Sequence, residues 1–316
     1  MRRVALIYNP QSGQYSAQRE KSVRGALAVL KDAGLEADAL ETDAPGSAKN
    51  LARVAARNGY DTILACGGDG TVHEVLQCLV GTDVALGVVP LGTANALAQD
   101  LGLGRSPVKA VRTLLSAVPT KVPVGRIFYR DNAGVERSSY FTVAAGIGAD
   151  ALLMASLDAG LKRRFGYALY VIEATRIWAT HPFPLFTASF ALAGSGETQQ
   201  SHISQLLAVR VRSFGGVLGT LVPGATLSSP TLNLITFKTQ SRFRYLRFLL
   251  AVVAGRHTFS DEVQRLDVTA VDCLPRSGSK TPIYVEADGE VLGHLPARIE
   301  IAPQTLTLLI PPGAQP

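Results

Sequence analysis

The stretch CGGDGTVHE, residues 66–74, decides the fold, because it joins an apolar strand to a helix through a run of glycines. Three glycines in four positions let the backbone adopt positive φ angles and lie close to a ligand. The apolar run Thr62–Cys66 predicts the strand, and the spacing from about Val72 to Leu79 predicts the helix. Backbone N–H groups at the start of such a helix form a phosphate cradle, with Asp69 beside the phosphates. A tight turn that only caps the helix is the alternative.

A second glycine turn, PLGTANAL at residues 90–97, follows the next predicted strand, Ala85–Val89. The carboxyl ends of parallel strands meet at one edge of a sheet, so two such turns can hold one nucleotide between them. Asn9 and Ser12 follow the first predicted strand and Thr42 follows the second, so we expect them at the same edge. The turns match neither GxGxxG nor GxxxxGK[ST], which disfavours a Rossmann dinucleotide site and a Walker loop.

The pattern of predicted secondary structure changes near Lys121. The first third alternates strands and helices, beginning with the strand Val4–Tyr8 and the helix Ala17–Asp32. This alternation predicts an α/β domain with a parallel sheet covered on both faces. Residues 122–301 contain mostly short β runs between Gly, Pro and Asn turns, which predicts a β-rich sandwich or barrel.

We therefore expect an α/β domain over residues 1–121 and a β-rich domain over residues 122–302. Two helical stretches interrupt the β-rich part, Leu161–Trp178 and Tyr245–Ala254.

The composition narrows the class of protein. The chain has 316 residues, of which 47% are hydrophobic and 18% charged, which excludes disorder, collagen and coiled coil. Three widely spaced cysteines form no CxxC pair, so a disulfide framework or zinc knuckle is disfavoured and a reducing compartment is favoured. Met1 to Arg3 lead directly into a strand, so we expect no signal peptide and a cytoplasmic location. The apolar runs contain too many Pro, Gly, Ser and Thr residues for a transmembrane helix.

The net charge of +6 is unevenly distributed. Between Lys162 and Arg256 there are 11 Lys and Arg residues but only two acids, which gives +9. Such a stretch favours an anionic partner: nucleic acid, a membrane surface or phosphates. No aromatic-rich nucleic-acid motif accompanies the charge, so we expect no nucleic-acid partner. The segment 242–250 alternates arginine with Phe, Tyr and Leu; membrane contact and core packing are equally favoured for it.

Taken in order, seven motifs resemble the diacylglycerol kinase catalytic-domain family, which includes bacterial soluble lipid kinases, sphingosine kinases and ceramide kinases. GGDGT alone is shared with NAD kinases, but its combination with the later motifs is specific, and the resemblance covers nearly the whole chain. The motifs are NPQSG (9–13), CGGDGTVHE (66–74), PLGTAN (90–95), AGIGAD (145–150), RFGY (164–167), FGG (214–216) and EADGE (286–290).

The resemblance implies the following roles. Asp69 would lie at the reaction centre, while Asp288 and Glu290 would face the γ-phosphate from the β-rich domain. Glu290 is the first choice for the base and Asp69 the second, although Asp-Gly is by itself a common hairpin turn. Asp150 would contact the polar head of the lipid, and Asn95 would also bind substrate. The residues implied for ATP binding are Asn9, Ser12, Thr42, Gly67, Gly68, Gly70, Thr71 and Thr93, with Glu74 orienting the phosphate turn and Arg163 or Arg164 reaching the phosphates.

Two departures from the family pattern concern acids. Many relatives have Asp where this chain has Ala96. In bacterial relatives an acid within the segment equivalent to residues 223–233 binds structural magnesium, but here Ser228, Ser229, Pro230 and Asn233 stand in that segment. We therefore expect no protein-bound metal site and only the Mg²⁺ that is carried with ATP.

The resemblance implies an α/β domain of the NAD kinase and diacylglycerol kinase type followed by a β-rich sandwich, with a last strand in residues 303–316 returning to the first domain. It implies an ATP-dependent lipid kinase that phosphorylates a primary hydroxyl of a diacylglycerol-like or sphingoid lipid. The alternatives are an NAD kinase-like enzyme and a non-catalytic lipid- or nucleotide-binding protein. The expected partners are the lipid substrate and, peripherally, an anionic membrane surface, with a homodimer left open.

Overall fold

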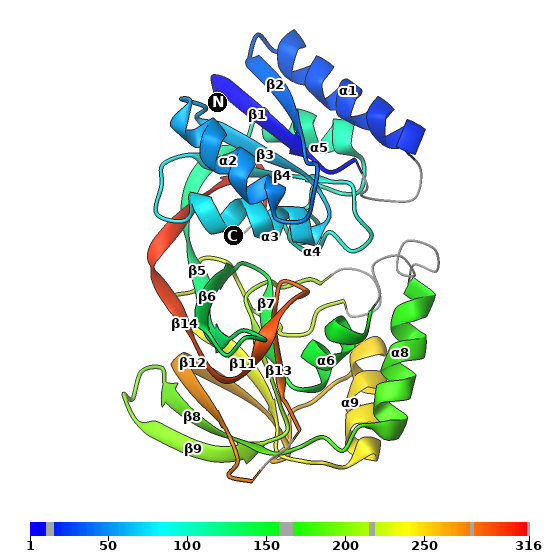
Figure 1. Ribbon diagram of the computed structural model, residues 1–316, viewed down its shortest axis with the longest axis vertical. Helices are drawn as coiled ribbons and strands as arrows, with labels where there is room; N and C mark the ends of the chain where they lie inside the picture. The colour runs from blue at the N-terminus through cyan, green and yellow to red at the C-terminus, as the bar shows by residue number, and fades with distance from the viewer. Residues whose placement is uncertain (11–15, 158–166, 215–218, 279–280, 315–316) are drawn as a thin grey trace.

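A computed structural model describes residues 1–10, 16–157, 167–214, 219–278 and 281–314 of the chain. The chain forms an α/β part from its N-terminal third and a β-rich part from the remainder, stacked along the long axis of the molecule (Figure 1). The predicted fold class is confirmed: parallel strands lie in the first part and antiparallel strands in the second.

The α/β part contains a parallel sheet with the strand order β2-β1-β3-β4. Every residue of β3 and β4 is buried, because helices cover both faces of the sheet and leave no strand face for polar side chains. Helix α5 was not predicted, although Ser106 followed by Pro107 is a helix-start signal and the Ser106 hydroxyl accepts from Lys109 N. The strands are β1 (Arg3–Tyr8), β2 (Glu36–Glu41), β3 (Thr62–Gly67) and β4 (Ala85–Pro90); the helices are α1 (Ser16–Asp32), α2 (Ser47–Arg57), α3 (Asp69–Leu79), α4 (Ala96–Asp100) and α5 (Pro107–Leu114).

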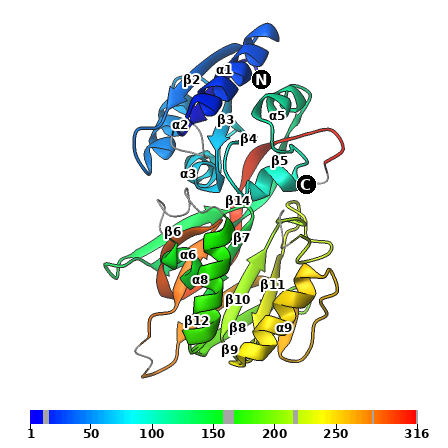
Figure 2. The ribbon, with the colours of Figure 1, turned by 90° about the vertical axis from the view of Figure 1, so that its right-hand side faces the viewer.

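Two long strands connect the two parts, β5 (Val118–Arg130) and β14 (Glu290–Ile310). They pair antiparallel along most of their length, and β14 also joins the parallel sheet beside β4 at Leu308. One end of each strand packs in the core of the α/β part and the other in the core of the β-rich part. Figure 2 shows β14 passing from one part into the other. We propose the domain division 1–121, 122–302 and 303–316 on this basis.

The β-rich part is built from antiparallel pairs around a second apolar core. Its helices α6, α8 and α9 lie on one side of the strands (Figures 1 and 2). The predicted helix Leu161–Trp178 falls partly outside the described residues. The strands are β6 (Glu136–Phe141), β7 (Ala144–Ile147), β8 (Phe186–Leu192), β9 (Thr198–Ile203), β10 (Gln205–Val209), β11 (Leu232–Phe237), β12 (Val263–Pro275) and β13 (Tyr284–Ala287); the helices are α6 (Ala149–Ser156), α8 (Tyr167–Thr180) and α9 (Arg242–Val253).

Within the described part of the chain, none of the helices has the length and apolar character that a membrane crossing requires.

Candidate active site

The two glycine turns lie against each other at the carboxyl ends of β3 and β4. Leu91 N donates to Gly67 O over 2.9 Å, which joins the turns through their backbones. A Cβ atom on Gly92 would lie 2.5 Å from the Cα atom of Gly68, so this approach is open only to glycine. Gly67 likewise has no room for a side chain, because a Cβ atom there would collide with Thr71. The turns therefore present backbone at the start of α3, as a phosphate cradle requires.

Asp69 links the two turns. Its Oδ1 atom accepts from Ala96 N over 2.7 Å and its Oδ2 atom accepts from Asn95 N over 3.0 Å, so the carboxylate holds the start of α4. Asn95 has a positive φ of 50°, and its side-chain amide exchanges two hydrogen bonds with the backbone of Gly92. Asn95 is also buried. These contacts make Asp69 and Asn95 part of the framework of the turn rather than groups that project openly toward a substrate.

The other predicted nucleotide residues gather at the same edge. Asn9 N donates to Cys66 O, and Thr42 N donates to Tyr8 O, so the ends of β1, β2 and β3 lie together. Thr93 lies in the second glycine turn, before α4, and is exposed. The predicted residues Ser12, Arg163 and Arg164 lie outside the described residues.

Glu74 lies differently from the expectation that it orients the phosphate turn. Its carboxylate accepts from Gly46 N over 2.7 Å and from Ala48 N over 3.1 Å. Gly46 belongs to the loop between β2 and α2, which also carries Thr42, and Ala48 belongs to the first turn of α2. We propose that Glu74 supports this loop, and through it Thr42, rather than binding nucleotide itself.

Asp288 is the anchor of the acidic turn between β13 and β14. Its buried carboxylate accepts from Thr142 N (3.0 Å), Val143 N (2.8 Å) and Ala144 N (3.1 Å). Thr142 and Val143 separate β6 from β7 here, because these N–H groups bind the carboxylate instead of a neighbouring strand. Asp288 also has a positive φ of 50°, which the hydrogen bonds around it stabilise.

His73 connects this anchor to the α/β part, a contact that the sequence did not indicate. Its Nδ1 atom lies 3.5 Å from Asp288 Oδ2, and its Nε2 atom lies 3.1 Å from Ser139 Oγ. The ring is buried, so α3 and the acidic turn meet through it. The one indication in the sequence that His73 belongs to the site was its position inside the stretch 66–74.

Glu290 is brought onto the first glycine turn. A Cβ atom on Gly70 would collide with Oε1 of Glu290, so the carboxylate lies directly over the Gly70 backbone. Glu290 is exposed, in contrast to Asp288. The structure thus places one predicted acid from the β-rich part over the first glycine turn of the α/β part.

A second pair of carboxylates, Asp150 and Glu286, lies behind the acidic turn. Both face Gly146: a Cβ atom there would collide with Asp150 Oδ2 and lie 2.8 Å from Glu286 Oε1. Glu286 Oε2 accepts from Gly289 N over 2.8 Å, so this residue also supports the turn. Sequence reasoning did not single out Glu286, although it lies two residues before Asp288 in the EADGE motif.

Burial raises the pKa of Asp150, and burial together with the negative charge of Asp150 raises the pKa of Glu286. Two carboxylates that share a buried site cannot both ionise readily, so the pair retains a proton at a pH at which an exposed acid has lost it.

This pair leads to a prediction about stability. Asp and Glu have a pKa of about 4 in the unfolded chain, whereas both groups have a raised pKa in the folded protein. Between the unfolded and the folded pKa the folded state binds more protons, so the folded protein loses stability as the pH rises through that range. Asp150→Asn and Glu286→Gln should therefore raise the melting temperature more at about pH 8 than at about pH 5. Thermal melts across this range measure the difference, with Asp272→Asn, an exposed ion-pair partner of Arg298, as control. A shift that does not depend on pH would contradict the prediction.

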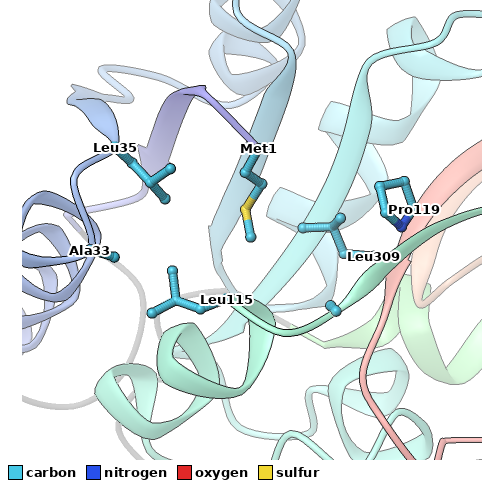
Figure 3. Close-up of a pocket in the computed structure, with 7 residues that line it drawn as sticks. Met1, Ala33, Leu35, Leu115, Pro119 and Leu309 are labelled. Atoms are coloured by element: carbon cyan, nitrogen blue, oxygen red, sulfur yellow. The ribbon is translucent and has the colours of Figure 1, made fainter.

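A cavity of about 200 Å³ lies away from this site (Figure 3). Met1 and Leu35 line it just before β1 and β2 begin, so it opens at the amino ends of the strands. The glycine turns are at the carboxyl ends. The cavity is therefore no part of the candidate nucleotide site.

Comparisons with known proteins match both parts. The model of the diacylglycerol kinase catalytic domain matches residues 3–127. The model of the YegS C-terminal NAD kinase beta sandwich-like domain matches residues 142–310, which is more than half of the chain. The chain belongs to the diacylglycerol kinase catalytic-domain family. This family makes the protein an enzyme, a lipid kinase, as the resemblance implied.

Individual members of the family match over nearly their full length. A diacylglycerol kinase of Mycobacterium tuberculosis (strain ATCC 25618 / H37Rv) is 29% identical, over 98% of this chain and 95% of the relative. A diacylglycerol kinase of Bacillus subtilis (strain 168) is 27% identical, over 94% of this chain and 92% of the relative.

Solved structures share the fold of this kinase family. The crystal structure of a putative diacylglycerol kinase from Bacillus anthracis str. Sterne matches with a TM-score of 0.76 and 20% identity, over 99% of this chain and 96% of that one. Yeast NADH kinase complexed with NADH matches with a TM-score of 0.52 and 10% identity, over 98% of this chain and 83% of that one. At these identities the likeness concerns the fold.

Proposed function

We propose that this lipid kinase uses ATP and transfers the γ-phosphate to a primary hydroxyl of a diacylglycerol-like or sphingoid lipid. The observation that carries the proposal is the Glu290 carboxylate lying over Gly70. A phosphate cradle and a candidate proton acceptor from two parts of the chain meet at that point. The names of the relatives, diacylglycerol kinases, support a lipid alcohol as the acceptor.

In the proposed reaction, the backbone of the two glycine turns and the N-terminus of α3 hold the phosphates of ATP. Glu290 accepts the proton of the lipid hydroxyl while the hydroxyl oxygen bonds to the γ-phosphorus of ATP. The bond between the γ-phosphorus and the oxygen that bridges it to the β-phosphate breaks, which leaves ADP. Mg²⁺ carried by ATP would neutralise phosphate charge. Asp69 and Glu290 are acids that contact the two turns and could help to hold it. Asp288 keeps the acidic turn in place through its three backbone hydrogen bonds.

The polar head of the lipid is proposed to lie near Asp150. Asp150 and Glu286 share a buried place behind the acidic turn, and their raised pKa values keep a proton on the pair at neutral pH. A pair that holds one proton can both donate to and accept from a hydroxyl of the head group.

The activity itself is the direct test. With Mg²⁺ and ATP, the purified protein should phosphorylate a diacylglycerol, a monoacylglycerol or a sphingoid base in mixed micelles and should leave NAD unmodified. Labelled ATP and separation of the lipid products measure this. Phosphate transfer to NAD alone would favour the NAD kinase-like alternative. Binding of lipid or nucleotide without any transfer would favour the non-catalytic one.

We further propose that the kinase acts in the cytoplasm and reaches its substrate by peripheral contact through the helix pair α8–α9. Trp178 Nε1 donates to Arg242 O over 2.9 Å, so the helices are joined at one end. Figures 1 and 2 show them side by side. The surface of the pair carries exposed apolar residues, among which Phe243 is 78% exposed: Val171, Ile172, Phe243, Leu249, Leu250 and Val253. Apolar residues flanked by arginines suit an anionic membrane surface.

This surface leads to a prediction of vesicle binding. Arg242→Ala with Arg247→Ala should weaken co-sedimentation with anionic vesicles by about tenfold or more, because each basic residue near such a surface contributes about 1 kcal/mol. Phe243→Ser should add to the loss. Arg244 is left unchanged because it forms an ion pair with Glu262.

The matched control is Arg105→Ala with Arg112→Ala, two exposed arginines of the α/β part. High salt should release the wild-type protein, since screening removes the electrostatic contribution. Equal binding to neutral and anionic vesicles would contradict the prediction and favour core packing as the role of the helix.

A further inference from the structure

Arg210 is a charged residue buried where the apolar cores of the molecule meet. Its side chain and backbone together are only 1% exposed. It follows β10, and its neighbours Ala208, Val209 and Val211 belong to three different apolar clusters. Burying a guanidinium costs several kcal/mol unless partners compensate for the lost water. The groups that contact the Arg210 guanidinium therefore indicate its role.

The guanidinium binds backbone carbonyls from two separate segments. Its Nη2 atom donates to Leu227 O over 2.6 Å and to Pro123 O over 3.0 Å, and lies 3.5 Å from Ser229 O. Pro123 belongs to β5, one of the two strands that connect the α/β and β-rich parts. Leu227 and Ser229 belong to the loop 223–233, whose last two residues are the first two of β11. One side chain thus ties the connecting strand to this loop.

Arg210 is also coupled to the acidic turn. Its backbone N donates to Val143 O over 2.9 Å, and Val143 N in turn donates to Asp288 Oδ1 over 2.8 Å. Burial lowers the pKa of Arg210 to about 10, while the negative charge of Asp288 acts in the opposite direction. The Nε and Nη1 atoms have no hydrogen-bond partner among the described residues, so the backbone carbonyls that Nη2 contacts fix the position of the guanidinium.

The same loop is the segment in which the family resemblance implies a structural magnesium site, and its residues do not fit a metal ion. Residues 223–233 contain no Asp or Glu. The carbonyls of Leu227 and Ser229 face Arg210, and Asn233 Oδ1 accepts from Arg265 Nη2 over 2.7 Å. Among the described residues, no three side chains of His, Cys, Asp or Glu gather in a way that could hold a metal. Four oxygen atoms of this segment, those of Pro223, Leu227, Ser229 and Asn233, are thus bound to arginines.

We propose that Arg210 is a positioning residue: its guanidinium is a permanent cation against the loop 223–233 that ties this loop to β5, and it thereby holds the β5–β14 pair in the arrangement that places Glu290 over Gly70. The inference rests on the proposed function, since it assigns Glu290 to the kinase reaction. Arg210 touches no reacting atom: its guanidinium acts through Pro123 in β5, the strand that pairs with β14, and β14 begins at Glu290. Its loss should therefore lower kcat and leave KM for ATP nearly unchanged, because the glycine turns that hold the nucleotide are separate from it.

The test compares three variants. Arg210→Met keeps the length of the side chain without the charge and should lower kcat about tenfold to a hundredfold, the scale of a misplaced charge-stabilising group. Arg210→Lys keeps the charge and should restore most of that loss. Arg265→Met removes the other arginine bound to the same loop and should leave kcat unchanged. If Arg210→Met does not fold, Arg210→Gln takes its place in the comparison with Arg210→Lys.

Melting temperatures and kinetics separate the outcomes. If all three variants keep the kcat of the wild type and only their melting temperatures fall, the inference is overturned and Arg210 is a structural residue. A wild-type protein that phosphorylates no lipid would instead overturn the proposed function. Millimolar Mg²⁺ without nucleotide should leave the wild-type melting temperature unchanged. A stabilising shift in the wild type that Arg210→Met enlarges would show that the loop binds a metal, because removal of the positive charge favours a second cation there, and it would overturn the permanent cation.

Discussion

Glu290→Gln is expected to lower kcat by at least about a hundredfold, the usual scale for a positioned general base. Glutamine has the shape of glutamate but cannot take the proton of the attacking hydroxyl. Glu290 is exposed at the start of β14, so the melting temperature should change little. KM for ATP should also change little, because the nucleotide is proposed to be held by the glycine turns. Steady-state kinetics with a lipid acceptor in micelles measure both constants.

Gly70→Ala provides an independent check of the geometry behind this expectation. An alanine Cβ would collide with the Glu290 carboxylate and displace it from the turn. The double variant Gly70→Ala with Glu290→Gln should therefore be no slower than the slower single variant, as expected for residues that act as one unit. Glu300→Gln, the same change further along β14, is the matched control. Turnover near wild type in Glu290→Gln would place the proton acceptor elsewhere.

Asp69→Asn should lower turnover by about a hundredfold and also destabilise the fold by about 1–3 kcal/mol, the cost of leaving a buried donor unsatisfied. The carboxylate receives the N–H groups of both Asn95 and Ala96, and the amide of asparagine can accept only one of them. The structure makes Asp69 the link between the two glycine turns.

Thermal unfolding and kinetics together test this second expectation. Asp83→Asn, an exposed aspartate paired with Lys121, is the matched control and should change neither quantity. If Asp69→Asn loses activity without losing stability, Asp69 acts directly at the reaction centre. If it loses stability alone, with kcat of the folded protein unchanged, the site does not depend on it.

Several features of the fold could be predicted because they depend on local patterns. Continuous apolar runs indicate strands buried on both faces, and the glycine turns at 66–74 and 90–97 indicate backbone that approaches a ligand. The order of these turns and the later EADGE motif was enough for the family and for a lipid kinase. The break between β6 and β7 at Thr142 and Val143 was not predictable from the local sequence. Its cause is the carboxylate of Asp288, which lies 145 residues after Val143 in the chain.

The sequence by itself determined the alternation of strands and helices, the two glycine turns and the membership of the family, since each depends on residues close together in the chain. Only the tertiary structure decided that Glu290 lies over Gly70, that His73 meets Asp288, and that Arg210 is buried against the loop 223–233. The physical reason is that these contacts join segments of the α/β and β-rich parts that are far apart in sequence. A carboxylate or guanidinium takes its role from the neighbours that burial and charge bring to it, and no local pattern records those neighbours.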